Sequence, residues 1–461
     1  MLNCFTYESS AKVVSIVPII SAELSNWLSS QDLRVVNLVI INKFKASQGE
    51  FLLIFDNNGE LEKVLLGMDS KDNFLSLGAL PKKLPEGNYR LEADGFSPRQ
   101  LEFMIIAWGM GSYEFTKYKR SKTYGAILVC NDRCDLKKIN NILEAIYLTR
   151  DLINTPADDL YPEKLAEISL ALAKEHEAKI RIVKDEELMN DFPAVYAVGK
   201  GSYRRPVLID LEYGKMNYPR IILIGKGVCF DSGGLQLKPS SGMALMKKDM
   251  AGAAHALALG KLIMAQELPV NLRIIVPAVE NLPSGHSLKP GDIIRTRSKL
   301  TVEVRNTDAE GRLILADTLT LASEWKPKLI LDFATLTGAA RVALGMDISA
   351  VFSNDDQLAK DIIAATISAG EAAWQLPLYQ PYLEFLKTDI ADLSNIAIND
   401  GVGGGAIIAA LVLQQFVSPS ISWAHFDING YNITGKPGKP KGGEANCLIG
   451  VFDYLEKRFR H

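Results

Sequence analysis

Histidine and cysteine are scarce in this sequence, and both absences restrict its chemistry. The chain has five histidines, none of them in an HExxH pair, so a zinc protease site of that type is excluded. Its five cysteines are few and odd in number, which favours a reducing compartment over a disulfide framework. Cys130 and Cys134 are four residues apart, but no second Cys/His pair accompanies them. We expect ordinary reduced thiols at both positions.

Long apolar runs and an excess of positive charge are also missing. The longest apolar run, Ala406–Leu413, is too short to span a bilayer. The apolar residues from Val13 to Ile20 follow no basic leader and precede no small-residue cleavage site, so we interpret them as a strand. The net charge of −3 disfavours nucleic acid as a main partner. The expectation is a cytoplasmic protein without a membrane partner.

The length of 461 residues exceeds what one ordinary core holds, so two domains are expected. From about residue 150 the chain repeats a pattern of strand, glycine turn and helix, which is typical of an α/β domain with helices on both faces of a mixed central sheet. The predicted division is a smaller N-terminal α/β domain at 1–138, a linker helix at 139–160 and a larger C-terminal catalytic domain at 161–461.

Local patterns predict the elements within these domains. In the first domain we expect strands at Leu33–Ile41, Phe51–Phe55, Met104–Trp108 and Ala126–Val129, with a turn at 56–59. In the second we expect strands at 207–211, 220–224, 272–277 and 329–333, and helices at 162–176, 250–267, 312–325 and 406–417. The first domain carries no catalytic constellation.

The run NTDAEGRL at 306–313 is the most informative segment. In an extended backbone, side chains two residues apart point the same way, so Asp308, Glu310 and Arg312 are predicted to face one cavity. Two carboxylates suit a divalent metal, and the arginine suits an oxyanion or carboxylate. The alternative for Arg312 is an ion pair with Asp308 or Glu310.

A second cluster lies upstream, in GKGVCFDSGG at 225–234 and MKKDMAGAA at 246–254. Its glycines lack the GxGxxG and GxxxxGK[ST] patterns of nucleotide sites, and G-x-S-x-G is missing too. The two clusters, in this order, resemble the leucyl (cytosol) aminopeptidase family of two-metal exopeptidases over roughly residues 152–454. That resemblance implies hydrolysis of N-terminal residues, Leu and other apolar residues preferred, through a water that bridges two metals.

Metal ligands follow from the resemblance. Lys226, Asp231, Asp249 and Glu310 would hold the tighter ion, while Asp231, Asp308 and Glu310 would hold the more exchangeable one. The ions are expected to be Zn²⁺ or Mn²⁺, with Mg²⁺ possible, because oxygen-rich ligation leaves the identity open. By chemistry alone, Lys226 would be a phosphate or carboxylate anchor, and its role as a neutral amine ligand is carried over from the family.

The resemblance assigns the remaining roles as well. Lys238 would stabilise the oxyanion, and Arg312 would hold bicarbonate as a general base. Peptide substrates would meet Met246 and the backbone of Thr335, Leu336 and Gly338. The family also implies a homohexamer.

Two segments depart from the family pattern. Ser298–Thr301 reads SKLT instead of SGKT, and 442–447 reads GGEANC instead of a GATG-type segment. The second departure leaves side-chain preference open. A Cys-Gly-type dipeptidase in thiol turnover and a DNA-binding accessory factor therefore stay as alternative hypotheses.

Overall fold

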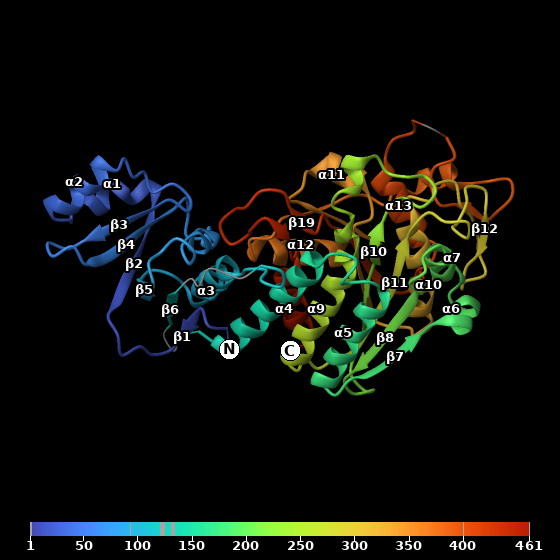
Figure 1. Cartoon of the computed structure of the whole chain (residues 1–461), viewed down its shortest axis with the longest axis horizontal. Helices are drawn as coiled ribbons and strands as arrows, with labels where there is room; N and C mark the ends of the chain where they lie inside the picture. The colour runs from blue at the N-terminus through green and yellow to red at the C-terminus, as the bar shows by residue number, and fades with distance from the viewer. Residues whose placement is uncertain (1, 93, 120–124, 131–133, 400, 461) are drawn as a thin grey trace. The chain divides into compact units, whose positions relative to one another are not determined.

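The computed structural model describes residues 2–92, 94–119, 125–130, 134–399 and 401–460. The described chain divides into two compact units. In Figure 1, residues 1–147 of the first unit run from blue to teal, and the second unit runs from teal to red. Unit 1 comprises 1–147 with 432–442, and unit 2 comprises 148–431 with 443–461. Helix α4 (Leu136–Asn154) contains the boundary between the two units and covers only the first part of the linker helix expected at 139–160. The functional division at 138 and 161 stays a prediction.

Unit 1 is built on a six-stranded mixed sheet in the order β1-β6-β5-β2-β4-β3. Among the described residues, β3 pairs with β4 antiparallel, and the other neighbouring strands pair in parallel. The strands are β1 (Phe5–Thr6), β2 (Val13–Ile20), β3 (Phe51–Phe55), β4 (Leu61–Met68), β5 (Gly87–Leu91) and β6 (Ala126–Val129). The helices are η1 (Ser21–Glu23), α1 (Leu24–Leu28), α2 (Leu33–Ile41), η2 (Phe74–Ala79) and α3 (Pro98–Ser112).

Two of the strands expected in this unit are wrong. Leu33–Ile41 forms helix α2, whose N-cap Asp32 accepts a hydrogen bond from the Val35 amide at 2.8 Å. Met104–Trp108 lies inside helix α3, which begins with a capping box of Ser97 and Gln100 and has a proline at its start. Both start signals stand in the sequence, but the continuous apolar runs behind them favoured strands.

Unit 2 contains a nine-stranded mixed sheet in the order β16-β15-β18-β14-β9-β11-β8-β7, with β10 paired to β11. Strands β18, β14, β9, β11 and β10 run parallel to their neighbours in that stretch. The strands are β7 (Lys179–Val183), β8 (Val207–Tyr213), β9 (Arg220–Gly225), β10 (Gly227–Asp231), β11 (Asn271–Asn281), β14 (Leu329–Ala334), β15 (Ser349–Ser353), β16 (Ala373–Gln375) and β18 (Ser422–Asp427). The two-unit α/β architecture with a mixed central sheet confirms the expected fold class.

Smaller elements surround this sheet. A three-stranded sheet consists of β12 (Ile293–Arg295), β13 (Thr301–Glu303) and β17 (Leu393–Ser394). The helices are α5 (Pro162–Glu175), α6 (Asp185–Asp191), α7 (Pro193–Gly199), α8 (Ser240–Met243), η3 (Met246–Met250), α9 (Ala251–Ala265), α10 (Glu310–Glu324), α11 (Gly338–Leu344), α12 (Asp356–Ser368), η4 (Gln380–Leu386), α13 (Gly405–Gln414) and α14 (Leu448–Phe459). The helices and strands expected for this region are confirmed, with shifts of one to a few residues at their ends.

Helices α9 and α10 cover opposite faces of the central strands. On β11, Ile275 belongs to the buried cluster that contains Leu313 and Leu319 of α10. Its neighbour Ile274 faces α9, where a Cβ on Gly260 would lie 2.1 Å from it. Successive strand residues point to opposite faces, so each helix is packed against its own side of the sheet. Both helices begin at the same edge, next to the segments that carry Asp249 and Asp308.

Among the described residues, no helix combines the length and apolar content needed to cross a membrane.

Candidate metal centre

The candidate site lies at the carboxyl ends of the parallel strands of unit 2, where ligand sites of open α/β sheets gather. Lys226 follows β9, Asp231 ends β10, and Thr335 follows β14. Asp249 lies in the short helix η3, directly before α9. Asp308 lies two residues before Glu310, the first residue of α10. The fold therefore brings the two sequence clusters together, as expected.

The NTDAEGRL run does not form one extended face, so the prediction that Arg312 shares a face with Asp308 and Glu310 is wrong. The backbone is not extended through Arg312, because α10 begins at Glu310. Glu310 gains its position from the N-terminus of this helix, where the helix dipole favours a carboxylate. Arg312 lies two residues further along the helix and therefore points to a different side.

Lys226 bridges one pair of carboxylates. Its ammonium lies 2.9 Å from Asp249 Oδ2 and 2.8 Å from Glu310 Oε1, and it donates to the Thr335 carbonyl at 3.2 Å. The Thr335 hydroxyl in turn donates to Asp249 Oδ1 at 2.6 Å. All four residues are buried, so their charges interact in a low-dielectric environment.

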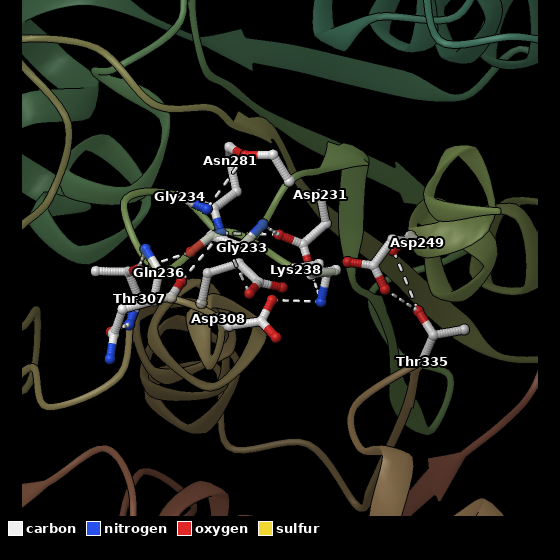
Figure 2. A network of polar contacts seen from close by, with 12 residues as sticks. Asp231, Gly233, Gly234, Gln236, Lys238, Asp249, Asn281, Thr307, Asp308 and Thr335 are labelled. Atoms are coloured by element: carbon white, nitrogen blue, oxygen red, sulfur yellow. Dashed lines mark hydrogen bonds and ion pairs between the residues drawn. The ribbon is translucent and has the colours of Figure 1, made fainter. Parts of the chain in front are cut away.

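Lys238 bridges a second pair, as Figure 2 shows. Its ammonium lies 2.8 Å from Asp231 Oδ2 and also contacts Asp308 Oδ1. Asp231 Oδ1 accepts from the Gly233 amide and from Asn281 Nδ2, both at 2.8 Å. Because its other oxygen is held in this way, Asp231 presents Oδ2 to Lys238.

The donor set fits divalent cations. One oxygen each from Asp231, Asp308 and Glu310 lies within 4.8 Å of the others. Buried Asp249 Oδ2 and Asp308 Oδ1 face lysine ammonium groups without a well-aligned hydrogen bond. Four carboxylates here face two ammonium groups, which leaves excess negative charge in a site that buries most of it. Oxygen-rich ligation of this kind suits Mn²⁺, Mg²⁺ or Zn²⁺.

The carboxyl pKa values reflect the same crowding. Burial, together with the charges of Glu310 and Asp249, raises the pKa of Asp231 well above its usual value. Burial likewise raises the pKa of Asp249 to about 6, against the opposing effect of Lys226. Burial alone would lower the pKa of Lys226, but the surrounding carboxylates outweigh it and raise that pKa. The carboxylates around Lys226 thus favour its charged form.

Arg312 is buried beside the cluster but not inside it. Its Nη1 donates to the Asn395 carbonyl at 2.6 Å. Its buried Nε finds no hydrogen-bond partner in the described part of the chain. Burial lowers the pKa of Arg312 to about 10, against the charges of Asp427 and Glu310. Among the described residues, no ion pair joins Arg312 to Asp308 or Glu310, so the alternative ion-pair interpretation is not supported. An unsatisfied buried N–H fits a small anion.

The expected substrate residues form part of the same edge. Thr335 contacts the cluster directly, and Leu336 follows it with its amide donating to Asp427 Oδ1 at 3.0 Å. Gly338, at the start of α11, is exposed, and Met246 is half-buried at the start of η3. Within the described part of the chain, neither of these two residues contacts the carboxylates through a hydrogen bond or ion pair.

Three supporting residues were missed in the sequence. Asn281 contacts Asp231 and Glu310, Asp427 holds the amides of Leu336 and Thr337, and Asn395 accepts from Arg312. Asn281 and Asp427 each end a buried strand. In the sequence, a polar residue at the carboxyl end of a buried strand could have indicated both as site residues.

Comparison with known proteins identifies relatives of both units. Residues 147–449 match the model of the cytosol aminopeptidase family, catalytic domain, and 14–131 match the M17 aminopeptidase N-terminal domain. A probable cytosol aminopeptidase of Chlamydia felis is 47% identical over 333 residues, 70% of this chain. One of Syntrophotalea carbinolica is 46% identical over 327 residues, again 70% of this chain. The matched part spans 65% of the length of each of these relatives.

Solved structures agree with these matches. A crystal structure of cytosol aminopeptidase from Coxiella burnetii superposes with a TM-score of 0.95 at 46% identity, covering 100% of both chains. The bottromycin maturation enzyme BotP in complex with Mn superposes with a TM-score of 0.87 at 30% identity, covering 97% of this chain and 100% of BotP.

Proposed function

Since this chain belongs to the cytosol aminopeptidase family, we propose that it is a metal-dependent aminopeptidase that releases the N-terminal residue of peptides. The observation that carries the proposal is the convergence of Asp231, Asp308 and Glu310 within 4.8 Å of one another. Lys226 and Asp249 adjoin this cluster on one side and Lys238 on the other.

The same residues would hold two divalent ions. Lys226, whose amine the bound cations would keep neutral, would bind one ion together with Asp231, Asp249 and Glu310. Asp231, Asp308 and Glu310 would bind the other. When bound, such a pair supplies Lewis-acid charge that activates water for attack on the peptide carbonyl. The Mn complex of BotP supports Mn²⁺ as a candidate, beside Zn²⁺ and Mg²⁺.

Lys238 and Arg312 would act on the reacting groups. Lys238 lies between Asp231 and Asp308, so its ammonium adjoins the carboxylates that would hold the metals and is available to a developing oxyanion. Arg312 has a buried N–H that no described residue accepts, which supports its role in binding bicarbonate. Bound there, the anion would accept a proton from the attacking water.

Substrate recognition would involve the loop after β14 and the start of η3. Backbone groups of Thr335, Leu336 and Gly338 would orient the free amine and the peptide. Asp427 supports this loop, because it accepts from both the Leu336 and Thr337 amides and from the Thr337 hydroxyl at 2.6 Å. Met246 would line an apolar pocket for Leu or Met side chains.

Metal reconstitution with a substrate panel tests the proposal. Protein stripped by chelation should be inactive on leucinamide and regain activity with Mn²⁺, Zn²⁺ or Mg²⁺, at two ions per chain by elemental analysis. Cys-Gly and a series of aminoacyl amides, assayed side by side, identify the preferred residue. Full activity of the metal-free protein would refute the proposed chemistry. A strong preference for Cys-Gly would replace the Leu assignment with the dipeptidase alternative.

A further inference from the structure

Asn281 occupies a central place among the acidic side chains. It is the last residue of β11 and is 3% exposed. In the parallel pairing of β10 with β11, it lies directly opposite Asp231. The strand backbone therefore fixes the position from which the amide reaches into the cluster, as the upper part of Figure 2 shows.

One amide group serves three acceptors from separate parts of the chain. Asn281 Nδ2 lies 2.8 Å from Asp231 Oδ1 and 3.0 Å from the Thr307 carbonyl. It also lies 3.4 Å from Glu310 Oε2. These acceptors belong to the end of β10, to the peptide that precedes Asp308, and to the start of α10. Asn281 thus contacts each of the three segments that carry Asp231, Asp308 and Glu310.

The rest of Asn281 holds the loop after β10. Its carbonyl accepts from the Ser232 amide at 3.1 Å and from the Ser232 hydroxyl at 2.7 Å. Its Oδ1 would lie 2.8 Å from a Cβ on Gly234, a residue with φ of +66°. The loop backbone therefore packs directly on the amide, which leaves the side chain little freedom to rotate.

The chemistry of an amide suits this place. A neutral donor stabilises carboxylates through hydrogen bonds, and unlike a lysine it adds no positive charge that would repel metal ions. By occupying Asp231 Oδ1 and Glu310 Oε2, it leaves Asp231 Oδ2 and Glu310 Oε1 to Lys238 and Lys226. Orienting contacts of this kind hold metal ligands in place and tune their affinity.

We propose that Asn281 is a positioning residue whose amide sets the spacing of Asp231, Asp308 and Glu310 and thereby the affinity and geometry of the metal centre. This inference rests on the proposed function. Asn281 would act by holding the carboxylates in place and would not touch the substrate.

The test compares Asn281→Ala with Asn271→Ala. Asn271 is also buried, at the opposite end of the same strand, and its side chain donates to the Lys215 carbonyl at 3.2 Å. Metal affinity is measured by competition with a fluorescent chelator, and kinetics on leucinamide are measured at saturating metal. Asn281→Ala should bind metal about 10–100-fold more weakly and keep a reduced kcat at saturation with KM nearly unchanged. Asn271→Ala should match the wild type in both measurements.

Equal metal affinity and kcat in the two variants would overturn the inference. If Asn281→Ala does not fold, Asn281→Leu keeps the volume of the side chain while removing the donors, and the same expectations apply to it. Measurements on the wild type distinguish a failure of the proposed function from a failure of the positioning role. A wild-type protein that binds no metal and has no peptidase activity would refute the proposed function, whereas an active wild type with unaffected Asn281 variants would refute the positioning role alone.

Discussion

At the scale of residues, the charges of the site depend on one another, so removing one side chain changes the charge balance of the others. Lys226 and Lys238 each contact two carboxylates, and burial makes every unpaired charge costly. Removing a carboxylate therefore changes both the metal-binding capacity and the charge balance. Removing a lysine leaves like charges facing one another. The residue-scale predictions separate these effects.

Asp308→Ala and Glu310→Ala should each abolish detectable aminopeptidase activity and lower the metal content, because each removes a donor from the three-carboxylate cluster. The fold should largely persist, and circular dichroism with thermal unfolding checks this. Asp389→Ala, at an exposed position, is the control. Retention of two metals and full activity in Asp308→Ala would remove that residue from the centre.

Lys238→Ala should lower kcat on the order of 10²–10³, the effect of removing one oxyanion donor, and should change KM little. The ammonium would act mainly on charge that develops in the transition state. Metal content should remain at the wild-type level. If KM rises while kcat is unchanged, Lys238 is a binding residue instead.

Arg312→Ala should be milder than the changes to metal ligands, because bulk buffer still accepts the proton from water. Added bicarbonate should accelerate the wild type more than the variant in steady-state assays. An identical response in both proteins would exclude the bound anion.

At the scale of elements, the residue at which a helix begins determines the direction in which the site side chains point. The alternation within NTDAEGRL suggested one extended face, whereas α10 begins at Glu310 and directs Arg312 toward Asn395. Similarly, α2 and the Met104–Trp108 part of α3 were expected as strands because they are short apolar runs. The capping residues Asp32 and Ser97 decided the outcome, since a satisfied first turn favours a helix.

The N-cap of α12 gives a prediction at this scale. Asp355 Oδ1 accepts from the Gln357 and Leu358 amides, both at 3.1 Å. The Leu358 amide contributes most to lowering the pKa of Asp355 below 3.8. Asp355→Ala should therefore destabilise the protein by about 1 kcal/mol at neutral pH, measured by urea unfolding.

The sign of the pH dependence follows from the lowered pKa. A carboxylate whose folded-state pKa is depressed stabilises the fold above its unfolded pKa, and this contribution disappears as the pH falls through the folded value. The stability difference between wild type and Asp355→Ala should thus shrink below pH 4. Asp355→Asn keeps a capping oxygen and should lose much less stability at neutral pH. A difference between wild type and Asp355→Ala that stays constant from pH 7 to pH 3 would contradict the charge contribution.

At the scale of the whole molecule, assembly would control which substrates reach the site. We propose a homohexamer, as the family resemblance implies, with the catalytic domains at its centre. Enclosed sites would admit di- to oligopeptides and exclude folded proteins. Light scattering should give a mass near six times 50.6 kDa, and the enzyme should leave a compact protein with a buried N-terminus intact. A stable, active monomer, or rapid trimming of such a folded protein, would contradict this proposal.

The sequence by itself determined the family, the α/β class and the identity of the acidic cluster, because these depend on local motifs and on strand–helix alternation. Asp308 and Glu310 are two residues apart, so any compact fold keeps them close. Only the tertiary structure decided which lysine pairs with which carboxylate, and that Asn281 and Asp427 support the site. Asn281 is 50 residues from Asp231, and Asp427 is 91 from Leu336. Contacts at such separations are set by the order and register of the strands, which no local pattern encodes.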